Sequence, residues 1–460
     1  MQAGRRAIEA DIRGHTFLVR RTVEALDVGH LVHESARCHP LNELGFWYCH
    51  DDNLRWFLVK PVGGPGHITV RECGKRVIRS GTCAKRNKKR NKRLEPCKAI
   101  GLMSGTSIDG IDVAAIQTDG DTLYALGPTL SVPYAVDLRA SIRRALGELD
   151  GPQEIEQELT VAHAAAVRRF LEETGGEPDD FDVVGFHGHT IAHRPDIRRT
   201  RQIGDGQRLA RELGIDVVAG FRLEDVAAGG QGAPLAPIYH AHLLKYLSTR
   251  GANLNWPIAV INIGGVANIT YIDEKALDDP SHLLAFDTGP GNALLDDWVK
   301  ARTGNDFDRD GELAASGSAD NAIVDALLNH EFFDQAPPKS LDRDAFATDV
   351  TRDLSIVDGA ATLTAFTVGS IAKAIVHLPA RPSQWLLTGG GRHNRTLCQN
   401  LEKRLGVVVP IEDVGGRGDS LEAEAFAHIA VRALRRLPIT FPRTTGVPRP
   451  ITGGVIHRVR

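Results

Sequence analysis

Over the larger part of the chain, the apolar positions follow two patterns, short runs typical of strands and a helical spacing. Short apolar runs at 99–105 and 110–120, joined by small and polar residues, predict a β-hairpin, and 122–132 predicts a third strand. Apolar residues at helical spacing within 154–174 predict an amphipathic helix, and 182–190 predicts a buried strand that stops at a His-Gly turn. Strands and helices therefore alternate as in an α/β protein.

A similar order of elements returns in the second half of the chain. The run at 258–272 repeats the first hairpin, and strands predicted at 282–291 and 384–391 each end in glycines and lead into a helix. The repetition predicts an α/β fold with two similar lobes that face one another across a cleft. The predicted domains are an N-terminal extension at 1–97, a first lobe at 98–250 and a second lobe at 251–460.

Residues 1–97 differ in composition from the rest of the chain. They hold 19 Lys and Arg against 10 Asp and Glu, and five of the six cysteines, whereas the whole chain has a formal net charge of −3. They contain no C-x-x-C pair, so a zinc site is not expected. We interpret the basic run at 85–93 as a solvated linker rather than a nucleic-acid contact. A translation start after this extension remains an alternative.

Membrane insertion and secretion are not expected. No apolar run reaches the roughly 20 residues that a membrane-spanning helix needs. The first residues carry arginines but lack the apolar core of a secretory signal. We therefore expect a soluble cytoplasmic protein.

Four predicted strand ends carry small-residue turns that suit phosphate groups, at 104–107, 264–265, 288–291 and 388–391. Glycine lets main-chain N–H groups approach an anion closely, and the N-terminus of a following helix favours negative charge. None of the turns matches a P-loop or a dinucleotide fingerprint. The sequence therefore favours a nucleotide cleft of another kind.

Three aspartates are candidates for the acidic part of phosphoryl-transfer chemistry. Such chemistry needs a carboxylate to take a proton and a cation to neutralise phosphate charge. Asp287 directly precedes a glycine turn, so we expect it at a strand tip that faces the cleft, where a general base belongs. Asp109 and Asp112 belong to the first hairpin, and for Asp112 both metal binding and turn capping stay open.

Eight short motifs follow one another between residues 98 and 446. They are GLMSGTSIDGIDVA at 101–114, GFHGHT at 185–190, AAGGQGAPLAP at 227–237, NIGGVANIT at 262–270, FDTGPGN at 286–292, FDRDG at 307–311, PPKS at 337–340 and EAEAFA at 422–427. In wording and order they resemble the anhydro-N-acetylmuramic acid kinase family. The resemblance implies a two-lobed sugar-kinase/Hsp70/actin-like fold that closes on ATP with Mg²⁺, and a homodimer. It further implies ATP-dependent phosphorylation of 1,6-anhydro-N-acetylmuramic acid coupled to hydrolytic opening of its anhydro bridge, which gives N-acetylmuramic acid 6-phosphate in peptidoglycan recycling.

The same resemblance implies the residues of the site. Asp287 would be the general base that activates water, and Glu422 would help to hold the sugar. His187, Asp205 and Arg222 are expected sugar-side contacts. ATP is expected at Gly105, Thr106, Ser107, Ile108, Asp109, Gly110, Ile111, Asp112, Gly264, Gly265, Gly389, Gly390 and Gly391, with Asp109 as a ligand of Mg²⁺.

Two positions depart from the family pattern. His189 stands where the family usually has Gln, and Gly220 stands where it usually has Asp. Because both changes bear on the sugar preference, a kinase of the same fold that acts on another sugar is one alternative. The other is a non-catalytic nucleotide-binding scaffold, against which Asp287 and the unbroken first hairpin argue.

Overall fold

The computed structural model describes residues 95–105, 107–342, 345–346 and 349–459, together with the backbone of 44–50, 53–61 and 68–77. The chain forms two compact units, Met1–Leu94 and Glu95–Arg460. In the first unit, β1 (Leu44–His50), β2 (Asn53–Pro61) and β3 (Ile68–Val77) form an antiparallel sheet in that order. The basic run at 85–93, interpreted above as a linker, lies outside the described residues.

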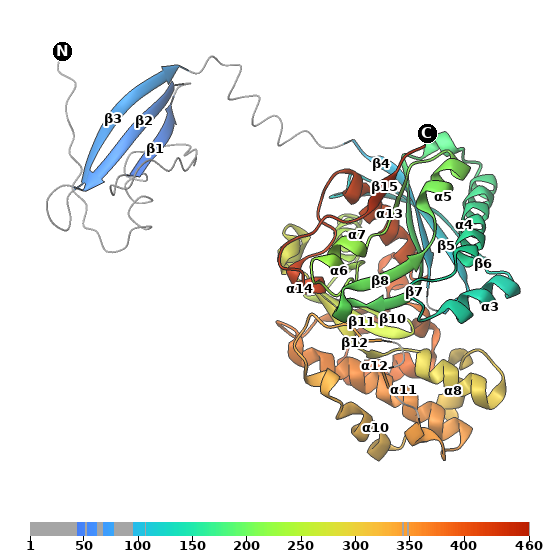
Figure 1. Ribbon diagram of the computed structural model, residues 1–460. Helices are drawn as coiled ribbons and strands as arrows, with labels where there is room; N and C mark the ends of the chain where they lie inside the picture. The colour runs from blue at the N-terminus through green and yellow to red at the C-terminus, as the bar shows by residue number, and fades with distance from the viewer. Residues whose placement is uncertain are drawn as a thin grey trace, which may run out of the picture. The chain divides into compact units, whose positions relative to one another are not determined.

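The first sheet of the larger unit has the strand order β15-β9-β7-β4-β5-β6, with β8 paired to β7 (Figure 1). The predicted first hairpin is confirmed, because β4 and β5 pair antiparallel. Helices α3, α4 and α5 share an apolar core with this sheet. The elements are β4 (Cys97–Ser104), β5 (Gly110–Thr118), β6 (Leu123–Pro133), α3 (Val136–Ala145), α4 (Gln153–Thr174), β7 (Val183–Arg194), β8 (Arg199–Ile203), α5 (Gly206–Leu213), β9 (Val217–Ala219) and β15 (Val455–His457).

The expectation that the strand at 182–190 stops at a His-Gly turn is wrong. Gly188 has φ +73°, but the irregularity lies inside β7, which continues to Arg194. β8 returns antiparallel along this extension and satisfies its backbone groups, so the strand need not end. The glycine therefore bends a strand instead of terminating it.

The second sheet has the order β12-β11-β10-β13-β14. Its outer face is covered by α11 and α12, and an aromatic-rich cluster joins α8, α9 and α11. The elements are β10 (Ile258–Ile263), β11 (Val266–Ile272), β12 (Leu284–Pro290), α8 (Ala293–Thr303), α9 (Glu312–Ser316), α10 (Asn321–Leu328), α11 (Ile356–Lys373), β13 (Gln384–Thr388), α12 (Arg395–Leu405) and β14 (Val408–Pro410).

Two helices, α7 (Pro237–Thr249) and α13 (Leu421–Leu434), lie between the sheets and share one core with both. α13 packs closely on the first sheet. A Cβ atom on Gly101 would lie 1.8 Å from the Ala423 carbonyl oxygen, and one on Gly185 would lie 2.1 Å from the Phe426 carbonyl oxygen. These two motif glycines thus serve helix–sheet packing rather than a ligand. The short helices α6 (Leu223–Ala227) and α14 (Pro442–Thr445) complete this region.

The predicted α/β architecture is confirmed for the larger unit, which has two sheets covered by helices. The division at residue 250, however, leaves out part of the first lobe. β15, close to the end of the chain, pairs with β9, and α13 packs on β4. The C-terminal segment therefore crosses back and completes the lobe that carries the first hairpin.

One helical segment among the described residues, Ile356–His377, is long and apolar enough to cross a membrane by composition. It comprises α11 and the turn that follows. Its apolar side chains are mostly buried in the core, against the second sheet and the aromatic-rich cluster. This burial is what a core helix requires, since such a helix is apolar on nearly every side.

Candidate active site

A cavity of about 100 Å³ lies where the two sheets meet α13. Strand ends of both sheets reach it, together with the segment before α7. Its polar lining comes from Arg222, His240, Asn262, Asn268, Asp287 and Glu422. The cavity thus brings together Asp287, Arg222 and Glu422, three of the residues singled out from the sequence.

Asp287 lies on β12 and is held through its backbone and one side-chain oxygen. Its N–H donates to the Lys339 carbonyl at 3.0 Å, and its Oδ2 accepts from the Leu341 N–H at 2.8 Å. Oδ1 has no hydrogen-bond partner among the described residues. Burial raises the pKa of this carboxyl to about 7, against the lowering effects of the Leu341 N–H and Arg222. One oxygen is therefore fixed, and the other is open to take a proton near neutral pH.

The PPKS motif and the residue after it position Asp287, through the Lys339 carbonyl and the Leu341 N–H. The Lys339 ammonium is buried, donates to the Phe332 carbonyl at 2.8 Å and lies 4.5 Å from the centre of the Phe332 ring. Burial lowers its pKa to about 8. The lysine thus anchors the segment whose main chain holds the aspartate, a role that the sequence did not reveal.

Arg222 is fixed by neutral partners. Its Nη1 donates to the Gly232 carbonyl at 2.6 Å, and its Nε donates to Nε2 of His187 at 3.1 Å. Nδ1 of His187 lies 2.9 Å from the Gly188 carbonyl, which can only accept, so Nδ1 carries the proton and Nε2 is free to accept. Burial lowers the pKa of His187, which keeps the ring neutral. Burial also lowers the pKa of Arg222, while Glu422 and other carboxylates counter that effect.

Glu422 is the second carboxyl of the cavity and lies in the first turn of α13. Its Oε1 accepts from the Asn262 side-chain amide at 3.3 Å. Burial raises its pKa, and Arg222 acts in the opposite direction. The cavity therefore holds two carboxyls of raised basicity beside one guanidinium.

Two expected sugar contacts do not line the cavity. His187 is 4% exposed and lies under the Phe426 ring with ring centres 4.5 Å apart, so it supports Arg222 from behind. Asp205 caps α5, where its Oδ1 accepts from the Arg208 N–H at 2.9 Å. The signal for Asp205 was in the sequence, because an aspartate directly before a helix is a typical N-cap.

The two departures from the family pattern lie outside the cavity lining as well. Nδ1 of His189 is 2.7 Å from the Ser104 hydroxyl, which also accepts from the Tyr134 hydroxyl at 2.7 Å. Burial lowers the pKa of His189 to about 4. Gly220 has φ +67°, a conformation that glycine adopts readily. His189 therefore belongs to a buried chain of hydrogen bonds behind the hairpin, and Gly220 to a turn that a side chain would strain.

The first hairpin turn is organised by Asp109. Its Oδ1 accepts from the Ser107 hydroxyl at 2.8 Å and from the Gly110 N–H at 2.9 Å. Ile108 has φ +55°, unusual for a side chain of this type. Thr106 lies outside the described residues. Gly105 directly follows β4 and Ile111 lies on β5, so the chain bends tightly where phosphates are expected.

Asp112 lies on β5 and accepts a hydrogen bond from the Ser131 hydroxyl. Burial raises its pKa to about 6, with further raising effects from Asp109 and Asp419. Among the described residues no group of three or more His, Cys, Asp or Glu side chains could hold a metal ion. Mg²⁺, however, is usually held by one or two carboxylates plus substrate phosphates. Oδ1 of Asp109 accepts two hydrogen bonds within the turn and Oδ1 of Asp112 accepts one, so Asp112 is the less engaged of the two candidates for such a cation.

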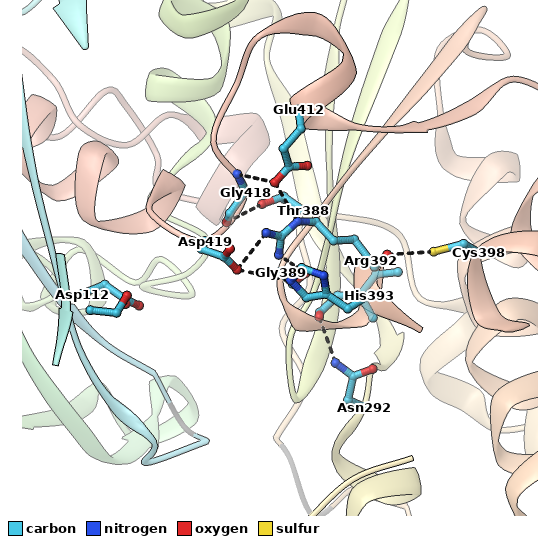
Figure 2. A network of polar contacts seen from close by, with 12 residues as sticks. Asp112, Asn292, Thr388, Gly389, Arg392, His393, Cys398, Glu412, Gly418 and Asp419 are labelled. Carbon is cyan, nitrogen blue, oxygen red and sulfur yellow. Dashed lines mark hydrogen bonds and ion pairs between the residues drawn. The ribbon is translucent and has the colours of Figure 1, made fainter. Parts of the chain in front are cut away.

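The remaining glycine turns lie on the second sheet. The carbonyl oxygens of Gly264 and Gly265 accept from the N–H groups of Asn292 at 2.7 Å and Gly291 at 2.9 Å. The 264–265 turn is thereby packed on the start of α8. At the end of β13, Gly389 has φ +77° and is followed by a short 3₁₀ turn, Gly390–His393. The family resemblance implies that this turn borders the adenosine of ATP, and it is called the adenosine-side turn below. Figure 2 shows it with the polar side chains around it.

A family model for anhydro-N-acetylmuramic acid kinase matches residues 97–458. The chain belongs to this family. It is 50% identical over 363 residues to the anhydro-N-acetylmuramic acid kinase of Paramagnetospirillum magneticum, covering 78% of this chain and 99% of that relative. It is 51% identical over 362 residues to the protein of that name from Rhodospirillum rubrum, covering 77% and 93%.

The predicted family is therefore confirmed, and with it the prediction of a phosphotransferase that uses ATP. Among solved structures, the chain is similar to the activator of the 2-hydroxyisocaproyl-CoA dehydratase from Clostridium difficile with bound ADPNP. That likeness has a TM-score of 0.36 at 12% identity and covers 74% of this chain and 97% of the other. The kinase assignment rests on the family match alone.

Proposed function

We propose that this kinase uses ATP and water to convert 1,6-anhydro-N-acetylmuramic acid into N-acetylmuramic acid 6-phosphate, in the recycling of peptidoglycan. The observation that carries the proposal is the state of Asp287. Its carboxyl lines a cavity between the sheets, one oxygen is held by a main-chain N–H, and its pKa is about 7. A general base is most effective when its pKa lies near the working pH.

The reaction begins with a proton transfer to Asp287. Its Oδ1 takes a proton from water, and the water oxygen forms a bond to the anomeric carbon of the sugar. The bond from that carbon to the bridging oxygen O6 breaks, and O6 keeps the electron pair. O6 then attacks the γ-phosphorus of ATP, and ADP leaves with the electrons of the broken P–O bond. Orientation of both substrates supplies much of the remaining acceleration.

Arg222 and Glu422 hold the sugar in this scheme. Arg222 is fixed by His187 and Gly232, so it offers a preorganised positive charge beside the base. Glu422 and the side-chain amides of Asn262 and Asn268 supply hydrogen-bond acceptors and donors for sugar hydroxyls and the acetamido group. These groups set the direction from which water meets the anomeric carbon.

The hairpin between β4 and β5 and the turns at 264–265 and 389–391 receive ATP. Asp112 would hold Mg²⁺ together with phosphate oxygens, and Asp109 keeps the hairpin in shape. When bound, Mg²⁺ neutralises charge on the phosphates as the γ-phosphoryl group is transferred. Cytoplasmic location and a homodimer remain predictions from the sequence.

An ADP-release assay tests the proposal. Purified protein is given ATP, Mg²⁺ and, one at a time, the anhydro sugar, N-acetylmuramic acid, N-acetylglucosamine and glucose. We expect sugar-dependent ADP with the anhydro sugar only. Release with ordinary hexosamines in preference would overturn the substrate assignment, and no sugar-dependent ADP at all would favour a non-catalytic nucleotide-binding protein.

A further inference from the structure

Arg392 directly follows the three glycines at the end of β13 and is the centre of a polar network (Figure 2). Its side chain is only 3% exposed. The guanidinium donates in three directions: Nη1 to the Gly389 carbonyl at 2.9 Å, Nε to Glu412 Oε1 at 2.9 Å, and Nη2 to Asp419 Oδ1 at 2.7 Å. A buried arginine with this many partners is held in a single orientation.

The partners of Arg392 come from separate parts of the second lobe. Gly389 belongs to the adenosine-side turn, Glu412 to a 3₁₀ turn after β14, and Asp419 to the segment before α13. Glu412 Oε1 also accepts from the Gly418 N–H at 3.0 Å, and the Thr388 hydroxyl donates to the Gly418 carbonyl at 3.3 Å. Hydrogen bonds donated by Arg392, Thr388 and Gly418 therefore hold the end of β13 to the 412–419 segment.

Gly418 lacks a side chain at a point where the Arg392 guanidinium lies against the main chain. A Cβ atom there would lie 2.4 Å from Nε of Arg392, closer than any side chain could be placed. Since Nε is the atom that donates to Glu412, a side chain at residue 418 would displace that bond. The glycine is thus required by the close approach of the guanidinium to the main chain.

The network reaches toward both substrates. Asp112 of the other lobe lies across from Asp419, whose carboxylate points to Arg392 and His393 (Figure 2). The negative charge of Asp419 contributes to the raised pKa of Asp112. Arg392 neutralises Asp419 on its opposite side. In the other direction, α13 begins at Leu421, two residues after Asp419, and its first turn carries Glu422 into the sugar cavity.

We propose that Arg392 is a positioning residue that fixes the adenosine-side turn to the segment leading into α13, so that nucleotide binding and the placement of Glu422 depend on each other. The sugar half of this inference rests on the proposed function, whereas the nucleotide half stands on nucleotide binding alone. Replacing Arg392 leaves the Gly389 carbonyl, Glu412 and Asp419 without their shared donor. The turn then loses its orientation, and Asp419 is left unneutralised opposite Asp112.

The test compares Arg392→Met with Arg392→Lys. ADP affinity is measured by calorimetry without sugar, and steady-state kinetics give KM for ATP, KM for the sugar and kcat. Loss of a buried charged partner predicts that Arg392→Met raises the Kd for ADP and the KM for ATP by about tenfold or more. We expect kcat at saturating ATP to change less than the KM for ATP, and the sugar KM to lose its dependence on ATP concentration. Lysine, with one ammonium in place of a fork, restores only part of the affinity.

Arg395→Met is the matched control. Arg395 is close in sequence, but its side chain is 80% exposed and its ion pair with Asp310 is long, at 3.9 Å. Because such an exposed pair contributes little, we expect its removal to leave the ADP affinity unchanged. If Arg392→Met does not fold, Glu412→Gln and Asp419→Asn each remove one arm at carboxylates that are 42% and 73% exposed. Each is expected to raise the Kd for ADP about threefold.

The proposal is overturned if folded Arg392→Met binds ADP within twofold of the unaltered protein, or if both single-arm variants do so. A protein that binds ADP normally but never turns over the anhydro sugar would instead refute the proposed function. In that case the nucleotide arm of the test still decides the role of Arg392.

Discussion

The cavity around Asp287 and the network around Arg392 contain the same residue types, one arginine and two carboxylates, in different arrangements. In the cavity, Arg222 donates to His187 and to a carbonyl instead of to a carboxylate. Burial therefore raises the pKa of both Asp287 and Glu422. In the network, Arg392 donates directly to Glu412 and Asp419.

Asp419 illustrates the contrast. Burial acts to raise its pKa, but the hydrogen bond and charge of Arg392 overcome this and lower it. Burial likewise raises the pKa of Asp287, and there the more distant arginine does not overcome it. Direct contact with an arginine therefore lowers the pKa of a buried carboxyl group, whereas an arginine that donates to other groups leaves that pKa raised.

The prediction with the largest expected effect compares one aspartate substitution in each region. Asp287→Asn should lower kcat by about 10²–10⁴ because no group then takes the proton of water. ADP affinity should stay within a factor of about two. Asp419→Asn should show the opposite pattern, with weaker ADP binding and a small change in kcat. Calorimetry and steady-state assays on both variants check this, and a kcat near that of the unaltered protein for Asp287→Asn would remove it from the role.

The second prediction concerns the arginine that does not touch its carboxylates. Arg222→Met removes the positive charge that holds the pKa of Asp287 down, so the acid limb of the pH–rate profile should move up by about one pH unit. Turnover at pH 7 should fall about tenfold, partly from weaker sugar binding. Arg392→Met, measured alongside, should leave the position of that limb unchanged. Equal displacement of the limb by both variants would erase the distinction between the regions.

A smaller effect is expected at His187, which acts through Arg222. His187→Ala removes the acceptor for Arg222 Nε and should lower kcat/KM for the sugar about fivefold. His187→Asn offers a carbonyl oxygen in its place and should recover part of the loss. If asparagine and alanine behave alike, hydrogen bonding to Arg222 is not what this residue contributes.

The smallest prediction concerns stability. Because folding raises the pKa of Asp287 from 3.8 to about 7, its favourable contribution is complete below pH 4 and is lost as pH rises through 7. Above pH 7 the buried charge costs stability. Asp287→Asn should therefore raise Tm by about 2–5 °C at pH 8 and by nothing measurable at pH 4. Thermal unfolding at the two pH values checks the sign, and destabilisation at pH 8 would contradict it.

Local patterns were enough to predict both hairpins, the strand that carries Asp287 and the two-sheet architecture. Each of these features depends on short apolar runs and on glycines close to them in sequence, so a local stretch of the chain is enough to predict it. The sequence predicts Asp287 at the tip of this strand, whereas β12 continues to Pro290, so the residue lies within the strand and pairs with β11. The roles expected for Asp287, Arg222 and Glu422 remain proposals, but the structure does bring the three together.

The features that could not be predicted depend on contacts between distant segments. β15 joins the first sheet across more than two hundred residues of sequence from β9, so no local boundary at residue 250 could reveal it. The motif around His187 predicts a contact with the sugar, yet in the fold His187 packs on Phe426 and accepts a hydrogen bond from Arg222. The Arg392 network joins residues 389, 412 and 419, and only the folded chain shows that one guanidinium reaches all three.

The most direct test of Asp287 as a buried base is the pH dependence of kcat/KM for the anhydro sugar at saturating ATP. The structure predicts that the rate rises tenfold per pH unit at low pH and levels off above an apparent pKa of about 7. This limb should be absent from the residual activity of Asp287→Asn. A rate that stays constant down to pH 5, or the same limb in the asparagine variant, would contradict the account.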